Sequence, residues 1–468
     1  MNTNTTTPAQ APPDAIGNRP PIFSKQQIWK LLIPLMIEQV LTSLMGTADT
    51  MMVSNVSSAA ISAVSLVDSI NVLLIYVFSA MATGGSIICA QYLGRRDVET
   101  ANETGRQLVL SVAVISLALT AFCLLLHQQI LRLIFGQVEA DVMANSITYF
   151  LITVLSYPFI ALYNAGAALF RVDGNSRLQM IVSTISNGVN IVGNAILIFC
   201  FDMGVAGAAL ATLFSRILCA VVVLYCLRRP KHTITVRDYW KIRPNFPLIR
   251  RILAVGIPTG IENGMFQFGK LAVQSTVSTL GTTAIAAQAM TAVLEFLASN
   301  AQLGIGIGMM TVVGQCIGAG RVDEARQNIK RLTFYAEITT IIACILIALA
   351  VKPVTIIGGM EPEEAALTCR LIYIIALFKP ISWTLSFLPA YGMRAAGDVR
   401  YSMIVATLTM WICRVGVATT LVRVFDFGII AVWIGMFTDW TTRAIFFTAR
   451  FYSGKWAQHS VIQSEAEA

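Results

Sequence analysis

The chain has 468 residues, of which 56% are hydrophobic and only 12% are charged, and its mean hydropathy is +0.70. So few polar side chains cannot cover a water-soluble particle of this length, which excludes a soluble globular protein and indicates an integral membrane protein. The nine cysteines stand singly and the three histidines lie far apart in the sequence. A disulfide framework, a zinc site and histidine-based catalysis are therefore not expected.

The first 26 residues are predicted to form a disordered cytoplasmic arm. They are rich in Thr, Pro, Ala and Asn, and they lack the basic segment and short apolar core of a signal peptide. Beyond the arm, apolar stretches of about 20 residues recur, each long enough to cross the hydrocarbon core as a helix. Their predicted starts are Trp29, Ala59, Gln107, Val142, Gln179, Val205, Leu248, Thr283, Ala325, Ala365, Ser402 and Ile429. The predicted fold is an all-α membrane protein with twelve transmembrane helices.

Lys and Arg concentrate in alternate connections between these segments. The connections after even-numbered segments carry Arg95, Arg96, Arg171, Arg177, Arg321, Arg326, Arg394 and Arg400. The first and seventh connections carry no Lys or Arg. Because short basic loops stay on the cytoplasmic side, both termini are predicted to be cytoplasmic, in a multi-pass protein of the plasma membrane. The net charge of +8 then requires no nucleic-acid partner.

The chain repeats itself at an offset of 224 residues (257 − 33). IPLMIEQ at residues 33–39 recurs as IPTGIEN at 257–263, and QYLG at 91–94 recurs as QCIG at 315–318. At an offset of 223, Arg171 and Gly174 recur as Arg394 and Gly397. This agreement indicates two copies of one six-helix unit, related by a pseudo-twofold axis along the membrane normal. The predicted domains are a first lobe at 27–227, a basic cytoplasmic linker at 228–247, a second lobe at 248–452 and a cytoplasmic tail at 453–468.

Polar residues inside the predicted helices mark the functional space between the lobes, because a charge in the membrane is costly unless it faces water or a partner. Glu38 and Asp49 stand three helical turns apart on one face of the first helix, so this face is predicted to be wet. The residues predicted to line a substrate cavity are Glu38, Asp68, Asn71, Glu262, Lys270 and Glu295.

Three of the acidic residues also have a structural interpretation. Asp49 could be a structural carboxylate, but an isolated acid inside the membrane usually serves function, and the functional reading is favoured. Glu38 and Glu262 each follow a Pro by one turn. They either satisfy backbone groups freed by the Pro or contact the substrate.

The other polar residues likewise have a second reading. Lys270 is predicted to pair with Glu295 or Glu262, which would make it compatible with a cationic substrate. Asp68 and Asn71 share a helix face, and they either line the cavity or join two helices by hydrogen bonds.

Three motifs carry a resemblance to a known family. They are MGTADTMMVS at residues 45–54, AQYLGRRDVETA at 90–101 with its partner GQCIGAGRVDEA at 314–325, and NGVNIVGNAILIF followed by GVAGAALAT within 187–212. In these motifs, and across residues 28–452, the chain resembles the multidrug and toxic compound extrusion (MATE) transporters. The resemblance implies a V-shaped pair of six-helix bundles that works as a monomer. It also implies secondary active export by alternating access, in which an organic cation leaves as Na⁺ or H⁺ enters.

The resemblance also implies a cation site in the first lobe, formed by Asp49, Asn190, Asn194 and Thr212. Asn190 and Asn194 are spaced i,i+4 and supply the hard carbonyl oxygens that Na⁺ prefers. Family members often have Asp at the position of Asn194, so Asp49 is the one protonatable ligand here. A single carboxylate could bind Na⁺ or a proton, which leaves the coupling ion open. No other cofactor or metal is expected.

Other classes of function fit the sequence less well. A flippase of lipid-linked sugars, from the same broader superfamily, should line its cavity with several basic residues, whereas the sequence offers mainly Lys270 against several acids. This acidic balance predicts a cationic substrate. No paired nucleophile and base supports an enzyme, and no repeated filter loop supports a channel. No Walker A motif is present, so an ion gradient is the expected energy source.

Overall fold

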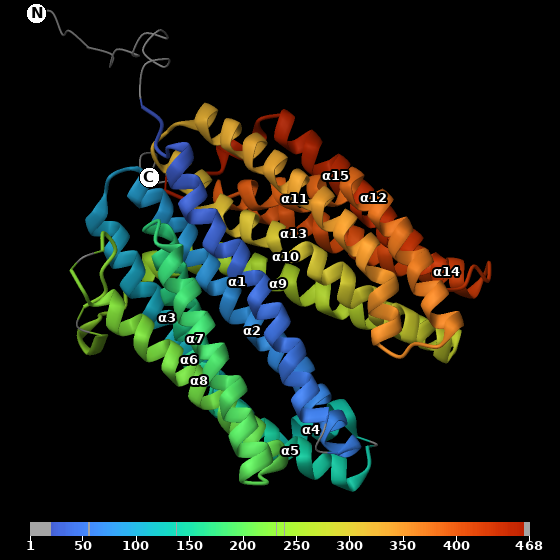
Figure 1. The fold of residues 1–468 in the computed structure, drawn as a ribbon. Coiled ribbons are helices and arrows are strands. Elements are labelled where there is room, and N and C mark those ends of the chain that lie inside the picture. The colour runs from blue at the N-terminus through green and yellow to red at the C-terminus, as the bar shows by residue number, and fades with distance from the viewer. Residues whose placement is uncertain (1–19, 55–56, 137, 231, 238, 463–468) are drawn as a thin grey trace, which may run out of the picture.

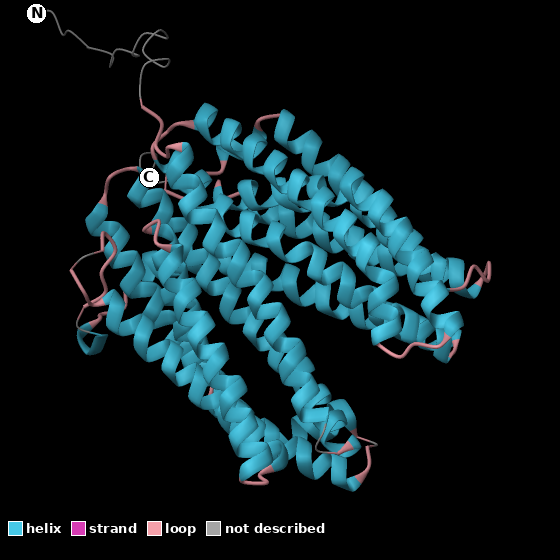
Figure 2. Cartoon of the chain, in the orientation of Figure 1, coloured by secondary structure: helices cyan, strands magenta, loops and turns pink. Residues whose placement is uncertain are grey.

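The computed structural model describes residues 20–54, 57–136, 138–230, 232–237 and 239–462. Within these ranges, the side chains of residues 45–51, 53, 54, 58 and 240 lie outside the description. The described chain is helical and contains no strand (Figure 2). The two ends of the described chain lie close together at one end of the molecule (Figure 1).

The first half of the chain forms a blue-to-green group of helices (Figure 1). Its elements are α1 (Lys25–Ser54), α2 (Ser58–Gly94), α3 (Val98–Leu125), α4 (His127–Phe135), α5 (Ala140–Leu155), α6 (Tyr157–Val172), α7 (Ser176–Asn194), the π-helical turn η2 (Ala195–Cys200) and α8 (Gly204–Leu227). These elements are called the N-lobe below.

The second half forms a yellow-to-red group, called the C-lobe below. After the short turn η3 (Tyr239–Lys241), its elements are α9 (Phe246–Val277), η4 (Ser278–Leu280), α10 (Thr282–Gly318), α11 (Val322–Ile357), α12 (Pro362–Ala395), α13 (Val399–Leu408), the π-helical turn η5 (Thr409–Gly416), α14 (Val417–Arg423), α15 (Ile429–Tyr452) and η6 (Lys455–Gln458).

These helices account for all twelve predicted segments, and the prediction of an all-α membrane fold is confirmed. Eight helical spans are long and apolar enough to cross a membrane, and α5 with α6, bent by 44° at their junction, makes a ninth. The remaining three, α1, α9 and α15, have spanning length but carry several charged residues. The largest error in a predicted start is at α3, which begins at Val98, nine residues (107 − 98) before the prediction.

The repeat seen in the sequence is also present in the turns between helices. Gly174 and its counterpart Gly397 both have positive φ, at 80° and 101°. Gly320 has a φ of 72°, and Arg96, at the matching place in the N-lobe, has a φ of 66°. A residue with a Cβ adopts this left-handed conformation only at some cost. The fold therefore imposes the same turn in both lobes, even where one lobe has no glycine.

The two lobes form a V, closed at the end where the termini lie and splayed at the other (Figures 1 and 2). At this closed end, the first helix of each lobe packs on the opposite lobe. Ile28, Leu32 and Leu35 of α1 are buried in a cluster with residues of α10, α12 and α15. Leu248 and Ile252 of α9 are buried in the cluster of the N-lobe. Each lobe thus contributes its first helix to the core of the other, and the lobes are called interleaved in this sense.

The closest contact between the lobes is made by glycines of α2 and α10. A Cβ on Gly94 would lie 2.0 Å from the carbonyl oxygen of Gln315, and one on Gly318 would lie 1.9 Å from that of Gln91. The flanking glutamines reinforce the contact, since Gln91 Nε2 donates to Ala395 O at 2.8 Å and Gln315 Nε2 donates to Val172 O at 2.8 Å. Every partner on one side has its repeat counterpart on the other.

The chain ends also pack at this closed end. Residues 1–19 of the arm predicted to be disordered lie outside the described residues. The rest of the arm is held by two hydrogen bonds, both 2.7 Å long: Arg321 Nη1 donates to Pro20 O, and Ile22 N donates to Glu324 Oε1. The described part of the predicted linker is also packed, since Val236 is buried in the N-lobe cluster.

The last described residues run across the closed end as a strap, defined here as residues 455–462. Trp456 is buried in the C-lobe cluster, and Ile462 is buried in the N-lobe cluster. Between them, Val461 N donates to Gln91 Oε1 at 3.2 Å, at the contact between the lobes. The strap joins the lobes because its two apolar anchors are buried in different lobes.

Replacing Gly318 by Ala should weaken the closed end. The added methyl group meets backbone, which cannot move aside as a flexible side chain would, so the lobes must separate locally. Spin labels at Arg95 and Arg400, in a variant without native cysteines, should report longer distances by double electron–electron resonance. Gly188→Ala is the control, because a Cβ there meets nothing within 4 Å. An unchanged distance distribution in Gly318→Ala would contradict the contact.

Shortening Ile462 to Ala should also favour separation at the closed end, because the strap loses its anchor in the N-lobe. Burial of such a side chain contributes about 1.5–3 kcal/mol, so the population of the closed form should fall noticeably in the same distance measurement. Ile357→Ala, at a side chain that is 85% exposed, provides the control for the substitution itself. Equal distances between the spin labels in the two variants would show that the Ile462 side chain does not help to hold the lobes together.

Candidate functional site

A cavity of about 760 Å³ lies between the lobes. Helices α1, α2, α6, α7 and α8 line it from the N-lobe, and α9, α10, α12, α13, η5 and α15 line it from the C-lobe. A second hollow, of about 1070 Å³, lies between α2, α4 and α5, but its only charged lining residue among those described is Glu139. The central cavity is therefore the candidate site.

The charge of the cavity lining is the reverse of the predicted balance. Among the described residues, three lining side chains are acidic and six are basic. The acidic ones are Glu38, Glu262 and Glu295, and the basic ones are Arg171, Arg216, Lys270, Arg394, Arg414 and Arg443. Asp49 belongs to α1, but its side chain is outside the described residues. The acidic excess expected from the sequence is not found in the described lining.

Each lobe carries one acid–arginine pair on the cavity wall. In the C-lobe, Glu262 Oε1 accepts directly from Arg394 Nη2. In the N-lobe, Gln179 lies between the two charges: it donates to Glu38 Oε1 and accepts from Arg171 Nη1, both at 2.9 Å. The two pairs are counterparts in the repeat.

These pairs explain why Pro is followed by Glu in both copies of the repeat. In one of the two interpretations from the sequence, the glutamates satisfy backbone groups near Pro34 and Pro258, but their hydrogen bonds go to side chains. Arg171 and Arg394 were predicted to lie in connections, and this is wrong. They occupy the last turns of α6 and α12 and line the cavity.

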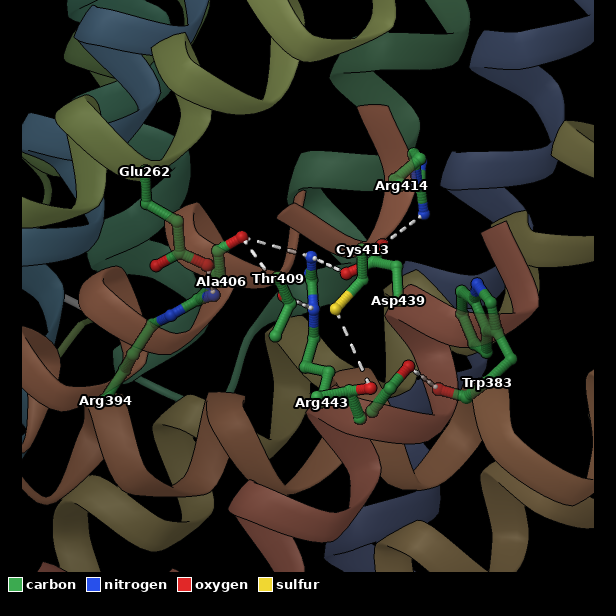
Figure 3. A network of polar contacts seen from close by, with 11 residues as sticks. Glu262, Trp383, Arg394, Ala406, Thr409, Cys413, Arg414, Asp439 and Arg443 are labelled. Atoms are coloured by element: carbon green, nitrogen blue, oxygen red, sulfur yellow. Dashed lines mark hydrogen bonds and ion pairs between the residues drawn. The ribbon is translucent and has the colours of Figure 1, made fainter. Parts of the chain in front are cut away.

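The C-lobe also contains a buried network that the sequence analysis missed. Asp439 is fully buried and faces two guanidinium groups, Arg414 Nη2 at 2.7 Å and Arg443 Nη2 at 2.9 Å (Figure 3). Arg443 is held further by Thr409 Oγ1 and Ala406 O, each at 3.3 Å. The π-helical turn η5, which carries Arg414, widens the helix here, as π-turns often do at functional sites. One signal was available, the i,i+4 spacing of Asp439 and Arg443 in an apolar helix.

The predicted partners of Lys270 are engaged elsewhere. Glu295 Oε1 accepts from Lys379 Nζ at 2.8 Å, and the same ammonium group donates to Ser299 Oγ at 2.6 Å. Since Glu262 is bound to Arg394, the pairing predicted for Lys270 is wrong. Its Nζ instead lies 5.0 Å from the centroid of the Phe266 ring.

The predicted cation site is assembled in part. Asn194 Nδ2 donates to Asn190 Oδ1 at 3.4 Å, and Asn190 Nδ2 donates to Thr212 Oγ1 at 3.2 Å, so three of the four residues form one chain between α7 and α8. Asn190 and Thr212 line the cavity, and Asn194 is buried behind them. The fourth residue, Asp49, is the one whose side chain is not described.

Asp68 and Asn71 were also predicted to line the cavity, and the structure places them elsewhere. Asn71 Nδ2 donates to Asp68 Oδ1 at 3.0 Å, and Tyr157 OH donates to Asn71 Oδ1 at 2.7 Å. Tyr149 OH completes the cluster with a 3.3 Å hydrogen bond to Asp68 Oδ1. Neither residue is among those that line the cavity. They join α2 to α5 and α6, which is the structural alternative.

Comparison with known proteins agrees with the two-lobed architecture. The MatE family model matches the chain twice, at residues 34–196 and 258–420. The matches begin 224 residues apart (258 − 34), which is the offset of the sequence repeat. The probable multidrug resistance protein NorM of Thermotoga maritima is 27% identical over 94% of this chain and 95% of its own. The uncharacterized transporter YisQ of Bacillus subtilis is 25% identical, over 92% of this chain and 95% of its own.

Solved structures share the same fold. A multidrug resistance MATE family transporter in an outward-facing conformation superimposes with a TM-score of 0.86 and 20% identity, over 92% of this chain and 96% of the other. A transporter from Pyrococcus furiosus, described as having a binding pocket of reverse polarity that suggests a different function, superimposes with a TM-score of 0.84 and 21% identity over the same shares. The two-fold match of the family model, which covers more than half of the chain, shows that this protein belongs to the MATE family, whose members are transporters and not enzymes.

Proposed function

We propose that this protein exports organic compounds from the cell by alternating access, as a monomer in the plasma membrane. The observation that carries the proposal is the central cavity, which lies between two pseudo-symmetric lobes whose described residues interleave at the closed end. Such a cavity can face either side of the membrane in turn if the contacts at the closed end break and equivalent ones form at the other end. Relatives named as multidrug resistance proteins support an export role.

The positive charges support an outward-facing orientation of this conformation. The basic connections that follow α2 and α10 adjoin the glycine contact at the closed end. Basic connections favour the cytoplasmic side, which supports a cytoplasmic position for the closed end and both termini. The cavity then faces outward, as in the solved outward-facing relative.

Energy for export is proposed to come from Na⁺ or H⁺ entering through the N-lobe. Asn190, Asn194 and Thr212 supply neutral oxygen ligands side by side, and Asp49 supplies the carboxylate. Three oxygen donors and one negative charge suit a small hard cation or a proton. One carboxylate accommodates a single charge per cycle.

A second candidate, a flippase for an amphiphile with an acidic head group, is favoured by one observation. Six of the described residues that line the cavity are basic, and several basic residues are what such a protein needs to hold phosphate. The organic cation predicted from the sequence depended on an acidic balance that the described lining lacks. A dye without a lipid tail separates the two functions, because an exporter moves it and a lipid flippase does not.

The proposal is tested with purified protein in liposomes. A Na⁺ gradient and a pH gradient are imposed separately, with ethidium and carboxyfluorescein as the cationic and anionic probes. One gradient should drive at least one probe against its own gradient, and protein-free liposomes should show no such movement. If a folded, correctly inserted protein moves neither probe with either gradient, ion-driven export of organic compounds is refuted.

Asp49→Asn should uncouple transport. The variant keeps the size of the side chain but removes the one protonatable and negatively charged ligand of the proposed cation site. Gradient-driven transport should fall to the rate without a gradient, while binding of the probe is retained. Asp323→Asn, which changes an exposed acid at the start of α11, is the matched control. Transport at the normal rate in Asp49→Asn would place coupling at another residue.

A further inference from the structure

We infer that the C-lobe wall of the cavity binds an acidic group of the substrate, held by Lys270 and Arg414 beside the ring of Phe266. The inference rests on the proposed function only in taking the cavity as the transport site. It names the substrate class as an amphiphilic organic acid, that is, a carboxylate, phosphate or sulfonate attached to an apolar body.

The first step is the balance of charges at this wall. Two basic residues are neutralised singly, Lys379 by Glu295 and Arg394 by Glu262. Asp439 serves both Arg414 and Arg443, so one negative charge faces two positive ones.

Lys270 adds a further positive charge, and it has no ion pair among the described residues. The C-lobe wall therefore has five basic groups and three acidic ones, an excess of two that is concentrated at Lys270 and the Asp439 network. Burying uncompensated positive charge is costly, and a bound anion removes that cost.

The second step is the position of these charges around one aromatic ring. The Lys270 ammonium lies 5.0 Å from the centroid of Phe266, and the Arg414 guanidinium lies 5.2 Å from the same centroid. Both cations also line the cavity. The two cations are therefore at most 10.2 Å (5.0 + 5.2) apart. Like charges within this distance repel each other, and a bound anion lowers that repulsion.

The third step is the unused hydrogen-bonding capacity of Arg414. Its Nε is buried and has no hydrogen-bond partner among the described residues. A guanidinium group binds carboxylate or phosphate oxygens through two parallel N–H groups. Arg414 thus keeps Asp439 on Nη2 and retains unused hydrogen-bonding capacity.

The remainder of the wall suits an apolar body. Trp383, Phe387, Met436 and Trp440 line the cavity near the charged groups. Aromatic and thioether side chains accept apolar groups of varied shape. The N-lobe wall is different. Glu38 is joined to Arg171 through Gln179, Arg216 Nη1 donates to Ser156 Oγ at 2.7 Å, and many other polar lining groups there are amides and hydroxyls. The acidic group is therefore assigned to the C-lobe.

The test measures binding by the full-length protein in detergent, without transport. The probes share one apolar body: 2-naphthoate, 2-naphthyl phosphate, neutral 2-naphthamide and the cation 2-naphthylmethylammonium. The wild type should bind the two acids at least roughly tenfold more tightly than the cation. A cation that binds more tightly than the acids would overturn the inference.

Variants locate the acidic group. Lys270→Gln should weaken binding of the acids by roughly tenfold and leave that of the amide unchanged, because only the charge-assisted contact is lost. Lys270→Arg should restore the preference for acids, which also shows that position 270 tolerates replacement. Lys352→Gln, on the exposed face of α11, is the matched control. If Lys270→Gln leaves the ratio of acid to amide affinity unchanged, the inference fails.

Two further arms separate the possible sources of the acid and the possible failures. In lipid nanodiscs, competition by phosphatidylglycerol against 2-naphthyl phosphate identifies a lipid head group, and its absence identifies a free organic acid; either result supports an acid site. If the wild type does not bind the acids but still moves ethidium under an imposed gradient, the acid site is refuted and the export proposal stands. Lys270-dependent acid binding without any transport would support the site and refute export.

Discussion

The direct backbone contact between α2 and α10 is the constraint on which the rest of the architecture depends. Two glycines, Gly94 and Gly318, allow the helices to approach so closely that neither position has room for a methyl group. Because the contact joins equivalent residues, it lies at the pseudo-twofold axis of the molecule. The crossing of α1 and α9, the hydrogen bonds of Gln91 and Gln315 and the strap all gather around it. The cavity exists because the lobes diverge from this point.

The two lobes share one arrangement of helices but differ in the polar side chains that they present. Both retain the pair of glutamate and arginine, although a glutamine separates the charges in the N-lobe. Both have a π-helical turn in the fifth span of the lobe, η2 and η5. Next to η2 the N-lobe has a chain of two amides at the end of α7 and a hydroxyl in α8, whereas η5 in the C-lobe carries Arg414 towards Asp439. The division of labour proposed here, a cation in one lobe and an acidic group in the other, follows from that divergence.

Much of the fold could be predicted from the sequence, because membrane spans and repeats leave strong one-dimensional signals. The twelve segments and the matched positions of Glu38 and Glu262 are read directly from hydropathy and from the offset of 224. The charged network of Arg414, Asp439 and Arg443 was not predicted, because a hydropathy average combines these residues with their apolar neighbours. The sequence of a single helix does not show which of its faces meets which neighbouring helix. The partners of Lys270 and the position of Asp68 away from the cavity depend on those contacts and were therefore not predicted. Arg171 and Arg394 were misplaced because they stand so near helix ends.

The strap has a consequence for the speed of the transporter. Whenever the closed end opens, the lobes cannot part unless Ile462 leaves the N-lobe or Trp456 leaves the C-lobe. Withdrawing one such side chain into water costs about 1.5–3 kcal/mol. If that cost falls on the barrier to opening, it slows each opening by roughly ten- to a hundredfold. The strap thereby limits the rate of turnover, and changes in it can adjust the rate of transport without altering the cavity that selects the substrate.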